Sequence, residues 1–240
     1  MNVSLSAQNI VKRFSGVVAL ADGDLAVASG EVVALLGANG SGKSTLTKVI
    51  TGGLEPDDGR IELDGRTTTF ASPQAAMAQG IAAVYQELSL IPDMTVAENI
   101  WLNHEPMGWA GRIDKQTVRR RTEELLALFA DTVQPTLTPD TPVVALPPDE
   151  KQIVEILKAM SRDPRLLILD EATASLDARQ VSRLFELMAQ WKAGGMALVF
   201  VSHRMDEIFR VADRAVVLRN GKSVGGMPMA EATEQELVAL

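Results

Sequence analysis

The stretch Gly37-Ala38-Asn39-Gly40-Ser41-Gly42-Lys43-Ser44-Thr45 decides the fold of this chain of 240 residues. It follows an apolar run, residues 32–36, that predicts a short buried strand, and it precedes residues 46–50, which predict the first turns of a helix. A glycine-rich turn that joins a strand to a helix and ends in Gly-Lys-Ser is typical of a phosphate-binding loop. A chance glycine-rich turn is the competing interpretation, and the strand and helix on either side argue against it.

Each residue type in this loop has a chemical reason. The glycines let the backbone curl so that successive N–H groups face one anion, and the helix N-terminus adds unpaired donors. Lys43 can reach the β- and γ-phosphates of a nucleotide, and the hydroxyl of Ser44 can bind Mg²⁺. We therefore expect a nucleotide with Mg²⁺ to be held by Gly37, Asn39, Gly40, Ser41, Gly42, Lys43, Ser44 and Thr45.

Composition limits the class of protein. An apolar content of 46% is ample for a core, and the absence of cysteine excludes disulfides and thiolate metal sites. The net charge of −8 argues against a nucleic-acid surface, which needs a basic patch. We find neither a signal peptide nor a run approaching the about 18 apolar residues of a membrane helix. We therefore expect a soluble, intracellular protein that reaches any membrane through a partner.

Strands and helices alternate along the chain, and several strands are unbroken Val/Ile/Leu runs. This pattern predicts an α/β fold with a mostly parallel sheet and helices on both faces. The predicted strands are 3–11, 24–28, 32–36, 60–63, 81–85, 166–171, 197–201 and 215–218, with turns at Gly16, 57–59 and Asn220-Gly221. One predicted helix begins at Ser72-Pro73, and the others span 95–103, 114–130, 150–160, 178–193 and 205–212. The segment 131–148 is expected to be loop.

Polar residues end three of these strands. Asp170 and Glu171 follow one apolar run, Gln86 ends another, and His203 ends a third. All belong to the carboxyl edge, where open α/β sheets bind ligands. Asp170 is placed to hold the metal, and Glu171 to orient or deprotonate an attacking water. Gln86 could sense Mg²⁺ and that water, and His203 the γ-phosphate; a lone histidine is more often structural.

Together these residues resemble the ATP-binding-cassette (ABC) ATPases. The segment 171–177 is similar to that family's run after the acidic strand, although Ala172 stands where proline is usual. The resemblance implies ATP and Mg²⁺ as ligands, with Phe14 stacking on adenine and Gln86 and His203 as the Q-loop and H-loop residues. It also implies one P-loop NTPase domain over 1–240. Its core, with a small antiparallel β subdomain, covers about 1–87 and 161–240, and a helical subdomain covers about 88–160.

The closer similarity is to the sugar importers of the ribose, xylose and galactose type, carried by segments 14–20 and 84–100. It implies an ATP-hydrolysing subunit, cytoplasmic and peripheral on the inner face of the membrane, that energises import of a monosaccharide. The implied partners are a second cassette, permease subunits and, indirectly, a sugar-binding protein, with no nucleic acid. Pro92, Met94 and Trp101 fall where the permease contact is expected, although core packing explains Trp101 equally well. That subgroup carries two cassettes in one chain. The helical pattern over 234–240 is not closed, so we expect an N-terminal half, with a frayed natural end as the alternative.

The segment Leu146–Gln152 departs from the family. It stands where a signature Ser hydroxyl and Gly N–H bind the γ-phosphate held by the opposite cassette. Pro147 has neither a hydroxyl nor an N–H, and Asp149 adds a carboxylate where an anion should dock. We therefore expect a degenerate signature that weakens the partner's site. A drifted sequence without functional meaning is the alternative.

Two other functional classes were weighed. A soluble ABC-type ATPase of DNA repair would need a coiled-coil or zinc insert, and one of translation would need basic arms; neither feature is found. A GTPase would need an Asn-Lys-x-Asp motif, and a small-molecule kinase would leave Gln86, Glu171 and His203 without a role. The sequence does not identify the sugar, and surface or loop packing is expected for His104.

Overall fold

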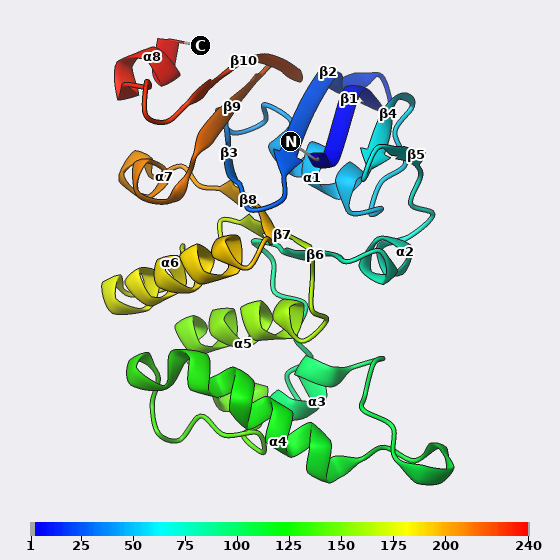
Figure 1. Cartoon of the computed structure of the whole chain (residues 1–240), viewed down its shortest axis with the longest axis vertical. Helices are drawn as coiled ribbons and strands as arrows, with labels where there is room; N and C mark the ends of the chain where they lie inside the picture. The colour runs from blue at the N-terminus through cyan, green and yellow to red at the C-terminus, as the bar shows by residue number, and fades with distance from the viewer. Residues whose placement is uncertain (1–2, 240) are drawn as a thin grey trace. The chain divides into compact units, whose positions relative to one another are not determined.

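The computed structural model describes residues 3–239 and divides the chain into two compact units (Figure 1). The first unit contains the residues up to Ala83, Pro164–Glu171 and the residues from Met188 onward. The second contains Val84–Asp163 and Ala172–Leu187. No helix among residues 3–239 combines the length and the apolar character that crossing a bilayer requires.

The strands of the described chain form one mixed sheet of ten, in the order β5-β4-β1-β2-β10-β9-β3-β8-β7-β6. The strands are β1 (Val3–Phe14), β2 (Val17–Ala28), β3 (Val32–Leu36), β4 (Asp58–Leu63), β5 (Arg66–Thr68), β6 (Ile81–Val84), β7 (Leu166–Asp170), β8 (Ala197–Val201), β9 (Arg214–Arg219) and β10 (Lys222–Pro228). The predicted α/β fold is thus confirmed, with parallel and antiparallel parts joined in one sheet.

The parallel part carries the phosphate-binding loop. β3 pairs in parallel with β8 on one side and β9 on the other, and β8 pairs in parallel with β7. Every residue of β3, β7 and β8 is buried, as expected for strands covered on both faces. The register sets Asp170 opposite Val201, so β7 and β8 end at the same level.

The antiparallel part is longer than predicted. The strands expected at 3–11 and 24–28 extend to Val3–Phe14 and Val17–Ala28, joined by a turn at Ser15 and Gly16. Register shifts along this pair interrupt the period-2 pattern from which strands are read in a sequence. The turn expected at 57–59 is also wrong, because Asp58 and Gly59 belong to β4.

Helices of the first unit cover a continuous apolar core. They are α1 (Lys43–Ile50), α2 (Pro73–Ala78), α7 (Met205–Val211), α8 (Glu234–Ala239) and the end of α6 (Ala178–Ala193). α2 begins as predicted, since the side chain of Ser72 accepts the N–H of Ala75 at 3.2 Å and Pro73 follows it. The fully buried core includes Leu5, Ile10, Leu25, Leu35, Leu46, Ile50, Ile168 and Val199.

The second unit is helical. It contains α3 (Val96–Trp101), α4 (Lys115–Leu126), α5 (Pro148–Met160), the start of α6 and three 3₁₀ turns, η1 (Trp109–Gly111), η2 (Ala127–Thr132) and η3 (Val143–Ala145). The helix predicted over 114–130 ends at Leu126 and continues as η2, and the predicted loop 131–148 includes η3. Thr95 and Glu98 form a capping box at α3, and Asp114 caps α4.

Trp101 is a core residue. Its side chain is 5% exposed, and its indole Nε1 donates to the Thr122 hydroxyl at 2.9 Å. A buried indole with a satisfied N–H stabilises the packing of α3 on α4. The expectation that Trp101 contributes to a partner surface is therefore wrong, and the packing interpretation is right.

His104 is also held inside the second unit. Its Nε2 lies 2.8 Å from the Ser161 hydroxyl and its Nδ1 lies 3.1 Å from the Leu102 carbonyl. Burial lowers the pKa of His104 from its usual value, and nearby Arg162 lowers it further. The neutral imidazole is thus the form that the fold favours.

We expect the free energy of unfolding to fall on acidification because of His104. As the pH drops below 6.5, the unfolded chain takes up the proton first, since the folded pKa is lower. Urea unfolding at about pH 7 and about pH 5 should show a smaller loss of stability in His104→Gln than in the wild type. His203→Gln is the matched control, because the chain has two histidines and His203 is exposed. An equal loss in His104→Gln and the wild type would contradict this assignment.

Candidate functional site

The loop that follows β3 can be formed only with glycines at two positions. Gly37 has φ +146°, and a Cβ there would lie 2.2 Å from the Leu218 carbonyl oxygen. Gly42 has φ +109°, and its Cβ would lie 2.8 Å from the Ala19 carbonyl oxygen. Any side chain would therefore push the loop off β2 and β9.

The hairpin between β9 and β10 supports the same loop. The N–H of Gly221 donates to the Ser41 carbonyl at 2.9 Å, while the Gly221 carbonyl accepts the N–H of Ala21 at 2.7 Å and that of Asp22 at 3.1 Å. Three segments distant in sequence thus fix the curvature of the loop.

The N-terminus of α1 has the donor set of an anion site. No side chain caps it at Gly42, and its first turn has no acidic residue. The Ser41 hydroxyl is buried and forms no hydrogen bond with any residue that the structure describes. Free N–H groups at a helix N-terminus, together with the charge of Lys43, favour a phosphate group.

Lys43 points back over the loop. Its Nζ donates to the carbonyl oxygens of Gly37 at 2.8 Å and Ala38 at 3.1 Å. Burial lowers the pKa of Lys43, and the charges of Glu171 and Asp170 oppose this effect. The ammonium therefore lies within electrostatic reach of both Asp170, which ends β7, and Glu171, which follows it.

Asp170 and Ser44 meet. Asp170 is 5% exposed, and it accepts a hydrogen bond from the Ser44 side chain. Burial, and then the charge of Glu171, raises the pKa of Asp170, while Lys43, Lys48 and Ser44 oppose the rise. A desolvated carboxylate beside a hydroxyl is an oxygen donor set that suits Mg²⁺, whose charge would offset the cost of burial.

Glu171 has an unusual backbone conformation. Its φ is +52°, in the left-handed region, which costs a residue with a side chain about 1–2 kcal/mol. Its N–H donates to the Val201 carbonyl at 2.9 Å, so the end of β8 holds this conformation. The turn brings Oε1 of Glu171 to 3.7 Å from Nδ1 of His203. Strain of this kind is typical of functional sites.

The side chain of His203 is 69% exposed, and the hydrogen bonds that fix the turn around it are formed by neighbouring residues. The Ser202 hydroxyl donates to the Glu207 carboxylate at 2.9 Å, and Arg204 Nη1 lies 2.8 Å from the same carboxylate. The N–H of Arg204 also donates to the Ser202 hydroxyl at 3.1 Å. Sequence reasoning missed Glu207, although an acid in the first turn of the helix after His203 was a usable signal.

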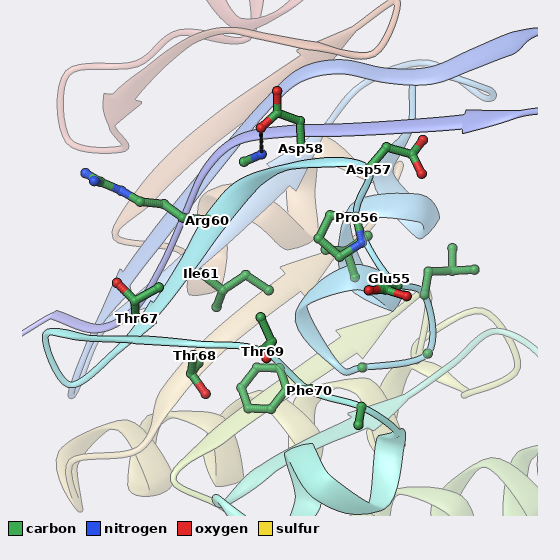
Figure 2. Close-up of a pocket in the computed structure, with 16 residues that line it drawn as sticks. Glu55, Pro56, Asp57, Asp58, Arg60, Ile61, Thr67, Thr68, Thr69 and Phe70 are labelled. Carbon is green, nitrogen blue, oxygen red and sulfur yellow. Dashed lines mark hydrogen bonds between the residues drawn. The ribbon is translucent and has the colours of Figure 1, made fainter.

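The first unit has several clefts, of which one borders the predicted site and a larger one does not. One of about 340 Å³ is lined by residues 37–38 of the loop and by Ser202 and His203, which places His203 beside the phosphate-binding loop. Figure 2 shows the other, of about 680 Å³, between β4, β5 and the segment after α1. None of the predicted site residues lines it. Of its acids, Asp57 is paired with Lys12 at 2.9 Å, and Asp58 accepts the Gly59 N–H at 2.8 Å.

Phe14 and Gln86, two further predicted site residues, are both exposed. Phe14 ends β1, is 43% exposed, and has Lys12 Nζ over its ring at 5.8 Å from the centroid, and its stacking on adenine stays a prediction. Gln86 is exposed and belongs to the second unit. Its contact with Mg²⁺ stays a prediction.

The degenerate signature segment forms hydrogen bonds with other residues of the second unit. Pro147 precedes α5 without a capping hydrogen bond, and Asp149 and Glu150 lie in the first turn of α5. The Gln180 amide donates to Asp149 at 2.7 Å, and the Gln134 N–H donates to the buried Glu150 at 2.9 Å. These carboxylates interact favourably with the dipole of α5 and oppose a second anion there.

The sequence pattern described as ABC transporter matches residues 20–174. The chain belongs to this family. It is 47% identical over 234 residues to "Ribose import ATP-binding protein RbsA 1" of Rhizobium etli, covering 97% of this chain and 45% of that protein. It is 44% identical over 221 residues to the "Putative ribose/galactose/methyl galactoside import ATP-binding protein" of Pseudomonas fluorescens, covering 92% and 42%. The chain thus spans about half the length of these relatives.

Solved structures agree with the family. The nucleotide-free ATP-binding cassette of an ABC transporter has a TM-score of 0.81 at 25% identity, covering 99% of this chain and 96% of that one. The cassette MJ1267 has a TM-score of 0.83 at 25% identity, covering 100% and 98%. The cassette fold implied by the sequence resemblance is confirmed.

The strain at Glu171 leads to a stability prediction. The free energy of unfolding of Glu171→Gly should be about 1 kcal/mol higher than that of Glu171→Ala, because glycine adopts positive φ without a Cβ clash. The same pair of substitutions at Glu62, within strand β4, is the matched control and should give the opposite order, since glycine weakens a strand. Urea unfolding of the four variants measures both differences. If alanine is the more stable at both positions, the backbone of Glu171 is not strained in solution.

Proposed function

We propose that this chain binds ATP with Mg²⁺ and hydrolyses it to energise a membrane importer of a monosaccharide. The observation that carries the proposal is the cluster of Lys43, Ser44, Asp170, Glu171 and His203 at one sheet edge around an anion site. The names of the relatives support the sugar. The binding of nucleotide and the coupling to transport are separate steps.

Each residue of the cluster has a role in this reaction. Lys43 and the N–H groups of the loop and of α1 bind the phosphates, and Phe14 supports the adenine. Ser44, Asp170 and Gln86 would hold Mg²⁺, which supplies charge neutralisation at the phosphates. Glu171 orients the attacking water and takes its proton, and His203 donates toward the γ-phosphate.

The proposed assembly contains a second cassette and permease subunits that receive sugar from a binding protein. The cassette would lie on the inner face of the membrane, with the helical subdomain at about 88–160 passing motion to the permease. Hydrolysis in this family requires ATP between two cassettes, so the signature segment of each bears on the site of the other.

We further propose that the segment 146–152 does not complete the opposite site. Pro147 lacks a donor, and Asp149 is already bound to Gln180 at the N-terminus of α5. A γ-phosphate brought there would meet a carboxylate. The assembly would then have one competent and one weakened site.

Nucleotide binding is tested at Lys43. Lys43→Ala should weaken ATP binding about 100-fold or more, because charge-assisted hydrogen bonds to the phosphates are lost. Titration calorimetry with Mg-ATP measures the affinity. Arg66→Ala, which removes an exposed cation on edge strand β5, should bind as the wild type does. Equal affinity of Lys43→Ala and Arg66→Ala would exclude this loop as the phosphate site.

The degenerate signature is tested by oligomeric state. Glu171→Gln should bind Mg-ATP and stay monomeric in size-exclusion chromatography, because blocked hydrolysis traps an ATP-bound pair only if both signatures can bind phosphate. Adding Pro147→Ser and Asp149→Gly to Glu171→Gln should produce an ATP-dependent dimer. A dimer of Glu171→Gln alone would show that Pro147 and Asp149 are not disabling.

A further inference from the structure

The segment between α3 and α4 is a short hairpin, which we call the Trp109 hairpin (residues 106–114). Met107 and Ile113 form an antiparallel bridge. The N–H of Gly108 donates to the Arg112 carbonyl at 2.7 Å, and the N–H of Asp114 donates to the Pro106 carbonyl at 2.8 Å. In Figure 1 this segment extends away from the helices α3 and α4 that it connects. The chain therefore forms an ordered projection here.

The hairpin exposes apolar side chains to an unusual degree. Trp109, at its tip, is 95% exposed, and Met107 and Ile113 on its arms are 60% and 50% exposed. Trp101, in the adjacent α3, is 5% exposed. Single exposed apolar residues are common on protein surfaces, but three on one projecting hairpin make a patch.

The base of the hairpin is rigid. The carboxylate of Asp114 accepts the N–H of Thr117 at 3.1 Å and its hydroxyl at 2.7 Å, which fixes the hairpin to the first turn of α4. These hydrogen bonds lower the pKa of Asp114, so the cap stays ionised near neutral pH. The exposed tip is thus held in place before any contact is made.

Two cations, Arg112 and Lys115, lie beside the ionised cap residue Asp114, in a chain whose net charge is −8. Arg112 and Lys115 are exposed, and neither forms a salt bridge with any residue that the structure describes. Farther along α4, Arg119 pairs with Glu123 at 3.1 Å and Arg120 with Glu124 at 2.6 Å, while Arg121 lies over the ring of Trp101. Arg112 and Lys115 are the cations closest to Trp109 in sequence.

We propose that the Trp109 hairpin inserts into the headgroup region of an anionic lipid membrane. A tryptophan at the tip matches the preference of indole for the membrane–water interface. Arg112 and Lys115 complement the negative surface of anionic lipid. The inference does not depend on ATP hydrolysis or on the identity of the sugar.

The narrow shape of the Trp109 hairpin favours a lipid bilayer over a folded protein as its binding partner. A stable protein interface buries about 800 Å² on each partner, which needs a broader surface than one hairpin tip. A narrow projection with apolar side chains can enter a deformable bilayer, which closes around it. The contact would be weak and reversible, because few side chains enter the membrane. Its effect would be to orient the second unit at the bilayer.

Co-sedimentation with vesicles tests the proposal. The chain should bind vesicles of equimolar phosphatidylcholine and phosphatidylglycerol, and bind phosphatidylcholine alone much more weakly. Trp109→Ser should reduce the affinity about tenfold or more, because the indole no longer leaves water. The pair Arg112→Ser and Lys115→Ser should remove most of the preference for anionic lipid, and added salt should do the same.

Val144→Ser is the matched control. Val144 lies in η3 of the same unit and is 61% exposed, so its loss removes a comparable exposed apolar group outside the hairpin. Its vesicle affinity should equal that of the wild type. Thermal unfolding and ATP affinity of every variant should match the wild type, which separates a lost membrane contact from a lost fold and from the proposed nucleotide site.

Three results would overturn the proposal. The first is no binding of the wild type to the anionic vesicles. The second is equal vesicle binding by Trp109→Ser and the wild type. The third is that the chain binds inverted cell-membrane vesicles but not pure lipid, and that protease treatment of those vesicles abolishes the binding. The hairpin would then bind a membrane protein rather than lipid.

Discussion

Parallel pairing of the buried strands β3, β7 and β8 is the constraint on which the site depends. The strands are buried along their whole length, and their observed register makes β7 and β8 end together beside β3. Their ends carry the phosphate-binding loop, the acids Asp170 and Glu171, and the turn that leads to His203. Packing of these strands therefore brings the functional side chains together at one edge of the sheet.

The same edge concentrates unfavourable energy. Asp170 is desolvated beside another carboxylate, Lys43 is partly buried, and Glu171 has a left-handed backbone. Each of these opposes folding when no ligand is present. The surrounding strands and the clamp that Glu207 forms on Ser202 and Arg204 hold them in place. Binding of phosphate and a cation would relieve the electrostatic part, so the site is built for an occupant.

The parallel strands and the main helices could be predicted because their signals are local. Unbroken apolar runs gave 32–36, 166–169 and 197–201, and the helix at 178–193 agrees with the structure in both bounds. The hairpin of β1 and β2 was underestimated because bulges break its period, and α4 was overextended because η2 continues its apolar pattern. For the site, residue types and strand ends were enough to gather Ser44, Asp170, Glu171 and His203. The left-handed φ of Glu171 was not predictable, because it depends on a backbone contact with the end of β8, which is distant in sequence. The Glu207 clamp is local, and the acid in the first turn after His203 was a signal for it.

The hydrogen bonds of Gly221 have a consequence for the order in which the loop forms during synthesis. Gly221, in the β9–β10 hairpin, ties Ser41 of the loop to Ala21 and Asp22 of β2. During synthesis the loop would therefore gain these hydrogen bonds only after the β9–β10 hairpin has left the ribosome. A nascent cassette that lacks this hairpin would carry all the residues of the loop and still be unable to hold its shape. Occupancy by nucleotide would then report that the whole unit has been made.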